Sequence, residues 1–234
     1  MPIQRVVYLT VMFAVSLRGG ISVTVRSTVG EAVMDVSVRD LTGCSGYGKT
    51  TSNGTLLLSD CQHMVLLLTR KGYRPAVQVV DAGVVDRNLV VTLEPDNGTG
   101  WTAPVCGRPG PGVPMKTIEV KPPRGVRFKR FGDVDFSGYQ IDFQEGKHAD
   151  NLVSMSGTHA SDGSPSSFWM MGLTQFEARS FHCGEFDGID IRGFSPDGKQ
   201  SRWVGYFYSF VEYSRVSKEA ADFFDRIISQ ACCR

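Results

Sequence analysis

The sequence lacks the short motifs that mark most enzymes and metal sites. None of its six cysteines forms a C-x-x-C pair, which argues against zinc ribbons and thioredoxin-like proteins. Neither the H-E-x-x-H motif of zinc proteases nor the G-x-S-x-G elbow of α/β-hydrolases occurs. No pattern indicates a cofactor or a metal ion. These absences favour a protein that binds or assembles over one that catalyses.

An excess of one charge and a long apolar run are missing as well. Lys plus Arg number 25 and Asp plus Glu 24, so we expect no nucleic-acid partner. The uncharged run Val6–Leu17 is shorter than the roughly 20 residues of a membrane-spanning helix. With Arg5 before it and two glycines after it, the run predicts a signal peptide over residues 1–20. We therefore expect a secreted or periplasmic protein without stable membrane insertion after cleavage; an N-terminal membrane anchor and a buried first strand are the alternatives.

The even number of cysteines agrees with export, because disulfides persist in oxidising compartments. The six are Cys44, Cys61, Cys106, Cys183, Cys232 and Cys233. We expect Cys44 to pair with Cys61, Cys183 with one of the two adjacent C-terminal cysteines, and Cys106 with the other. Six cysteines allow 15 pairings, and buried free thiols are the alternative.

Proline and glycine concentrate in one place. Residues 94–114 hold five of the eleven prolines. Proline removes a hydrogen-bond donor and glycine costs entropy, so we expect no regular element there. We assign a linker at 96–114, a first domain at 21–95 and a second at 115–234.

The first domain has short alternating or apolar runs separated by turn residues. The runs span residues 21–26, 33–38, 55–58, 64–69, 76–80 and 88–93. Their spacing of about 10 residues, without helical periodicity, predicts an Ig-like antiparallel β-sandwich.

A family resemblance points the same way. The first domain has G-x-x-x-x-x-V-x-V at 30–38, T-x-x-N-G-T-L-x-L at 50–58, G-Y-x-P at 72–75 and L-V-V-T-L-E-P at 89–95. This order resembles the carboxypeptidase regulatory-like domain, a transthyretin-like sandwich grouped with carbohydrate-binding-like folds. Asn53 replaces the frequent turn aspartate, and the family does not require Cys44 or Cys61. The resemblance implies a non-catalytic accessory module and names no ligand.

The second domain combines strand patterns with one helix. Strand-like runs span 116–120, 139–143, 176–182, 188–194 and 201–207, with an apolar, aromatic run at 166–171. Ser195-Pro-Asp-Gly198 predicts a hairpin turn. Ser217 is a good helix N-cap, and an apolar stripe runs from Ala220 to Ala231. We expect an α+β domain in which this C-terminal helix packs on an antiparallel sheet.

The serine-rich segment 154–167 is the first candidate site. It contains Ser156, His159 and Asp162, and Trp169 follows it. These three lie within seven residues, whereas a catalytic triad is normally assembled from separate parts of a fold. We interpret the segment as a polar loop that can bind a ligand, with a hydrolase as the alternative. His182 and Cys183 near two acidic residues could suggest a metal site, but a strand end with a disulfide explains them better.

The basic stretch 121–130 is the second candidate. Arg127, Lys129 and Arg130 could contact an anionic polysaccharide, lipid head groups or an acidic partner. The alternative is a solvated sheet edge whose charges discourage aggregation. We therefore predict a non-catalytic exported binding protein whose partner is an envelope protein or a polysaccharide. A purely structural envelope protein is the remaining alternative.

Overall fold

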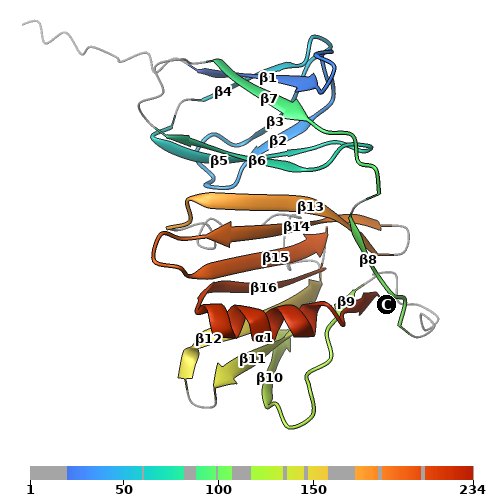
Figure 1. Ribbon diagram of the computed structural model, residues 1–234, viewed down its shortest axis with the longest axis vertical. Helices are drawn as coiled ribbons and strands as arrows, with labels where there is room; N and C mark the ends of the chain where they lie inside the picture. The colour runs from blue at the N-terminus through green and yellow to red at the C-terminus, as the bar shows by residue number, and fades with distance from the viewer. Residues whose placement is uncertain are drawn as a thin grey trace, which may run out of the picture.

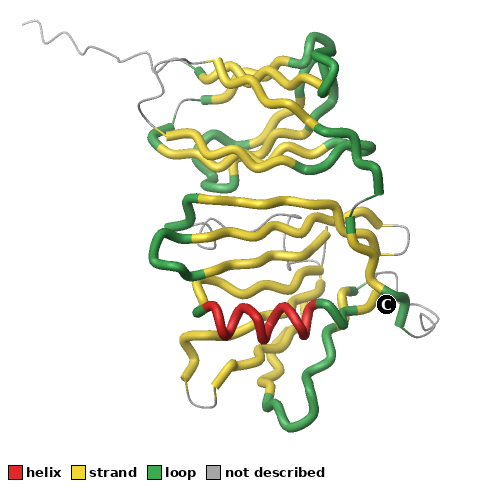
Figure 2. Tube along the Cα trace, viewed as in Figure 1, coloured by secondary structure: helices red, strands yellow, loops and turns green. Residues whose placement is uncertain are grey.

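The structure is a computed structural model that describes residues 20–59, 61–81, 88–98, 100–106, 117–133, 136–144, 147–157, 172–183, 186–206 and 209–233. Strands dominate this part of the chain, and one α-helix lies near its C-terminal end (Figure 2). The predicted signal peptide lies outside the described residues except for Gly20. The predicted fold class, mainly β with a sandwich and a helix-covered sheet, is confirmed.

The N-terminal part is a sandwich of two sheets. Its strands are β1 (Ile21–Ser27), β2 (Ser37–Asp40), β3 (Tyr47–Lys49), β4 (Thr55–Leu58), β5 (His63–Thr69), β6 (Ala76–Asp81) and β7 (Asn88–Leu93). One sheet has the order β4-β1-β7 and the other β3-β2-β5-β6. Alternate residues of β1 are buried, as the period-two pattern requires. Val23 and Val25 of β1 share a core with Leu66 and Leu68 of β5.

Two details correct the expected antiparallel sandwich. β1 and β7 pair in parallel. After β4 the chain forms β5 and β6 in the second sheet and then returns to the first sheet, where β7 runs in the same direction as β1. The strand expected at 33–38 begins only at Ser37. Asp35 has a φ of 57°, a left-handed conformation that turns the chain and interrupts a strand.

The C-terminal part is built on one eight-stranded sheet with the order β10-β11-β12-β16-β15-β14-β13-β8. Its strands are β8 (Trp101–Ala103), β10 (Phe128–Asp133), β11 (Phe136–Gln144), β12 (Lys147–Gly157), β13 (Gln175–Cys183), β14 (Phe186–Phe194), β15 (Gln200–Tyr206) and β16 (Ser209–Val216). β9 (Ile118–Glu119) and β17 (Cys232–Cys233) form a separate two-stranded sheet. The predicted hairpin at Ser195–Gly198 is confirmed between β14 and β15.

Strand β8 corrects the prediction that the Pro/Gly-rich segment has no regular element. It pairs in parallel with β13. The centres of the Trp101 and Phe181 rings lie 4.5 Å apart. The indole N–H of Trp101 donates a 2.8 Å hydrogen bond to the Asp190 carboxylate. These tertiary contacts outweigh the poor strand propensity of the surrounding residues.

Helix α1 (Lys218–Ile228) covers one face of the large sheet (Figure 1). The Ser217 hydroxyl accepts a hydrogen bond from the Ala220 N–H, which confirms the predicted N-cap. Phe224, Ile227 and Ile228 are buried against the sheet. The apolar stripe of α1 therefore closes one side of the main core of the C-terminal part.

A third apolar core joins the two parts. Leu41, Val65 and Leu67 of the sandwich pack with residues of the large sheet. The sheet contributes Ile191, Trp203 and Phe210, together with Leu173 before β13. Figure 1 shows the two parts stacked along the long axis, with β6 beside β13. The two domains are therefore docked to each other through buried side chains.

Three disulfides are present: Cys44–Cys61, Cys106–Cys232 and Cys183–Cys233. The predicted Cys44–Cys61 pair is confirmed, and Cys183 bonds to one of the two adjacent C-terminal cysteines as expected. The last two bonds fasten the chain end after α1 to β13 and to the segment after β8. No helix among the described residues is long and apolar enough to cross a membrane.

Candidate ligand-binding cleft between the domains

A cleft of about 1000 Å³ opens where the sandwich meets the large sheet. Three parts of the chain line it: the sandwich strands β2 and β3 with the β5–β6 turn, the segment after β7, and strands β13 and β14. The volume lies at the upper end of the range of small-molecule sites, roughly 300–1000 Å³. Because the third apolar core fixes both domains, the walls of this interdomain cleft are held in place.

The sandwich wall of the cleft carries an excess of positive charge, with three cations and one carboxylate, that of Asp35. Lys49 belongs to β3, and Arg70 and Lys71 follow β5 in the β5–β6 turn. Among the described residues, no carboxylate lies within ion-pair distance of these three cations. The Arg70 guanidinium instead lies 5.3 Å from the centre of the Tyr73 ring. The positive charges of this wall are therefore available to a ligand.

An aromatic ring stands beside these cations. Tyr47 of β3 is 55% exposed, although it is a large residue on a sheet. The Arg39 guanidinium lies 5.5 Å from the centre of its ring and can support one face. An exposed aromatic ring in a cleft provides a surface for apolar faces of a ligand.

The opposite wall carries acceptors and small polar groups. His182 Nδ1 on β13 lies 2.8 Å from Asp187 Oδ1 on β14. Asp96, in the segment after β7, accepts hydrogen bonds from the Ser180 hydroxyl and from the Gly98 N–H. The Asp96–Ser180 contact also ties the sandwich end to the large sheet. This wall can offer both donors and acceptors to a ligand.

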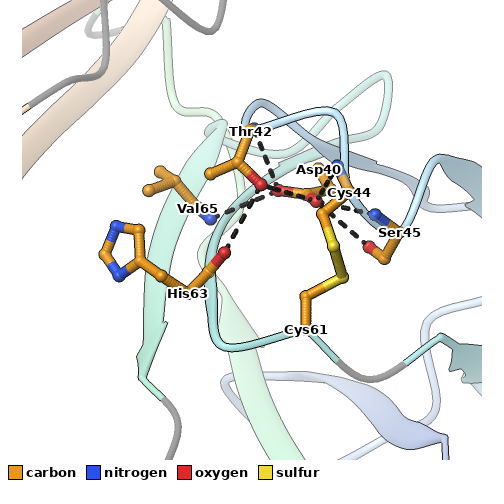
Figure 3. The surroundings of a disulfide bond; sticks show 7 residues. All are labelled: Asp40, Thr42, Cys44, Ser45, Cys61, His63 and Val65. Atoms are coloured by element: carbon orange, nitrogen blue, oxygen red, sulfur yellow. Dashed lines mark hydrogen bonds between the residues drawn. A yellow bond between two sulfur atoms is a disulfide. The ribbon is translucent and has the colours of Figure 1, made fainter.

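The hairpin that carries Tyr47 and Lys49 is held rigidly at its turn. Figure 3 shows the Asp40 carboxylate at the centre of the turn, surrounded by hydrogen-bond donors. Asp40 accepts from the N–H groups of Thr42, Cys44 and Ser45 at 2.9–3.0 Å. The Cys44–Cys61 disulfide fastens the same turn to the start of β5. The turn therefore positions β3 before any ligand arrives.

A second cluster of charges lies inside the C-terminal part. The Asp190 side chain is fully buried and receives hydrogen bonds from Arg202, from Arg179 and from Trp101. Burial alone would raise the pKa of Asp190, but the hydrogen bonds and charges of Arg202 and Arg179 hold that pKa below its usual value. Asp190 is therefore an ionised, fully paired carboxylate.

The same buried charge network extends to the helix. Asp225 of α1 receives 2.8 and 2.9 Å contacts from Arg202 and Arg192 and a 3.0 Å hydrogen bond from Tyr213. Burial raises the pKa of the Tyr213 hydroxyl, which stays protonated and donates. The network joins β8, β13, β14, β15, β16 and α1, so its role is to hold the fold together.

The residues of the predicted serine-rich site fall in two groups. Ser156 lies in β12 and not in a loop, because β12 extends to Gly157. Its hydroxyl lies 2.7 Å from that of Ser209, so a neighbouring strand holds it. His159, Asp162 and Trp169 lie outside the described residues.

The basic stretch 121–130 does not line the cleft. Lys129 and Arg130 are exposed on β10, the edge strand at the opposite end of the sheet from β13. Arg127 precedes that strand. The structure thus places these three cations on a solvated sheet edge and does not bring them together with Ser156 in one site.

Among the described residues, one group of side chains has the composition of a metal site. The side-chain ligand atoms of Cys106, Glu119 and Cys232 lie within 4.8 Å of one another. The two sulfurs are bonded to each other, so neither offers a thiolate. Cys183 is likewise in a disulfide, which removes it from the possible cluster around His182.

Sequence reasoning considered His182 only as part of a possible metal site and missed the cleft as a whole. Lys71 and Tyr73 flank the glycine of the β5–β6 turn, but the sequence marks them only as turn residues. Their partners across the cleft, His182 and Asp187, lie more than a hundred positions away. No protein-family model matches the sequence, and no curated protein matches it, so the cleft is interpreted from its own residues.

Proposed function

We propose that this protein is a non-catalytic binding protein that acts in the cell envelope or outside the cell and holds a polar ligand in the interdomain cleft. The cleft is the observation that carries the proposal. It combines a ligand-sized volume, an exposed aromatic ring, cations without an ion pair to the described residues, and hydrogen-bonding groups on fixed walls. A binding protein needs such a preformed site and no reacting group.

Two further observations support the compartment and the module type. Three disulfides fit an oxidising environment, where such bonds persist. The sandwich with its G-Y-x-P turn between β5 and β6 supports a carboxypeptidase regulatory-like module. In this proposal the module supplies one wall of the cleft, and the large sheet supplies the other.

The test is a binding screen with a cleft variant and a matched control. The full chain with intact disulfides is titrated with oligosaccharides and peptides, and binding is followed by isothermal calorimetry. Tyr47→Ala removes the exposed ring from the cleft, whereas Phe128→Ala removes a 44% exposed ring from the distant strand β10. We expect binding to weaken about tenfold or more in Tyr47→Ala and to stay unchanged in Phe128→Ala. Equal loss in both variants, or turnover of a bound compound, would refute the proposal.

A further inference from the structure

The two walls of the cleft differ in charge, and the difference specifies a ligand more closely than the shape does. Lys49, Arg70 and Lys71 stand on the sandwich wall without a carboxylate partner among the described residues. Asp96 and Asp187 line the cleft beyond them. Asp35, just before β2, also lines the cleft, so three cations face three carboxylates in all. The excess of positive charge lies on the sandwich wall, where Asp35 is the one lining carboxylate beside the three cations.

The acceptors beyond the sandwich wall are partly engaged. Asp96 accepts from the Ser180 hydroxyl with one carboxylate oxygen and from the Gly98 N–H with the other, whereas one oxygen of Asp187 contacts His182. Each carboxylate retains lone pairs that can accept from ligand hydroxyls. By contrast, the lysine ammonium groups have no protein acceptor within the described part of the chain and attract an anion.

A ligand that matches this lining has three features. It carries a carboxylate toward the lysines, several hydroxyls toward Asp96 and Asp187, and an apolar ring face toward Tyr47. A neutral sugar leaves the cations unmatched, and an inorganic anion leaves the hydroxyl acceptors and the aromatic ring unused. An acidic peptide offers carboxylates and amides, but few hydroxyls.

From this arrangement, and resting on the proposed binding role, we infer that the cleft binds an acidic oligosaccharide made of uronic-acid units. The rigid hairpin of β3 holds Lys49 and Tyr47 at one side of the site. The β5–β6 turn brings Lys71 to the same wall. Carboxylates of successive units would meet these cations while the ring faces lie against the tyrosine.

The experiment compares three probes on the full-length, disulfide-intact protein. The probes are a trigalacturonate, a neutral glucose trisaccharide and a short glutamate peptide, each titrated at low and at high salt. We expect the uronate to bind at least about tenfold more tightly than the other two. Its affinity should fall as salt rises, because the cations are solvent-exposed.

Charge variants locate the site. The double variant Lys49→Ala/Lys71→Ala should lose about tenfold or more in uronate affinity and most of the salt dependence. Lys218→Ala, an exposed lysine on α1, is the control and should bind like the parent protein. Lys129→Ala/Arg130→Ala tests the rival basic edge on β10 and should also bind like the parent.

Each other result overturns a defined part of the inference. Equal affinity for the neutral trisaccharide would remove the acidic specificity while leaving the binding role intact. Tighter binding of the glutamate peptide would replace the sugar with a protein partner. Loss of uronate binding in the β10 variant, and not in the cleft variant, would move the site. Failure of all three probes to bind would overturn the uronate ligand, and the broader screen with Tyr47→Ala would then decide the binding role separately.

Discussion

The molecule holds charged groups in two contrasting ways. In the buried charge network, Arg202 is 4% exposed and Asp190 is fully buried, and each group is paired. In the interdomain cleft, Lys49 and Lys71 are exposed, and no ion pair joins them to the described residues. Both regions contact β13 and β14, so the same strands serve both arrangements.

The difference separates structural charges from ligand-binding charges. A buried ion whose partners are all supplied by the protein has no capacity left for a ligand, and its loss leaves an uncompensated charge. An exposed ion without a protein partner costs the fold little and can exchange water for a ligand group. Variants of the two regions, of the turn beside the cleft and of one partly buried carboxylate are taken below in order of decreasing expected effect on stability.

The largest effect is expected at the centre of the network. Asp190→Asn leaves Arg202 buried without a full countercharge and should lower the free energy of unfolding by about 3–5 kcal/mol. Urea denaturation followed by tryptophan fluorescence measures it. Asp222→Asn, which removes an exposed i,i+4 partner of Lys218, is the control and should cost less than about 0.5 kcal/mol. Similar losses in both variants would mean that the buried charge network does not stabilise the fold.

The second-largest loss of stability is expected at the turn that positions β3 beside the cleft. Cys44→Ser/Cys61→Ser opens a loop with a sequence separation of 17 and should cost about 3 kcal/mol. Asp40 still holds the turn, so the loss should be local. Hydrogen exchange should accelerate over β3 and stay unchanged in β15. Acceleration across the large sheet as well would show that the turn and the network unfold together.

The third effect concerns Glu212, a half-buried carboxylate that forms no ion pair with another described residue. Glu212 lies on β16 between Val153 and Trp203, and burial raises its pKa to about 7. Since the unfolded pKa is near 4.5, the folded protein retains this proton between about pH 4.5 and 7 while the unfolded chain loses it. The contribution of Glu212 to stability is full below that window and is lost as the pH rises through it.

Glu212→Gln removes this pH-dependent loss. The variant should be more stable than the parent above pH 7, by at most about 3 kcal/mol, and closely similar below pH 4.5. Urea midpoints measured from pH 4 to pH 8 test the window. Gln140→Ala, a half-buried polar change on β11, controls for altered packing and should shift all midpoints equally. A stability difference that does not change with pH would contradict the assigned burial effect.

Elements with a regular pattern could be predicted from the sequence. The alternation in β1 and the apolar run in β5 define strands, and Ser217 with the following stripe defines α1. These elements can be recognised locally, because the spacing of apolar side chains determines which face of a strand or helix is buried. The Cys44–Cys61 pair could be predicted because both cysteines lie within one small domain.

Elements stabilised by distant contacts could not be predicted. β8 forms because Trp101 reaches Asp190 and Phe181, which local composition does not reveal. Asp35 interrupts a run whose apolar pattern favours a strand. The interdomain cleft depends on how two sheets dock, and docking brings together residues whose separate segments look like ordinary turns and strand ends.

The smallest effect on stability is expected in the cleft itself. Lys49→Ala and Lys71→Ala should each change the free energy of unfolding by less than about 0.5 kcal/mol, because neither cation pairs with a described residue. Arg202→Ala is the contrasting variant, since it removes a cation from inside the network, and should cost several kcal/mol. Urea denaturation under the same conditions measures all three. A loss above about 1 kcal/mol in a lysine variant would show that the cleft charges stabilise the fold, and the distinction between the two regions would then fail at the residues on which the ligand proposal depends.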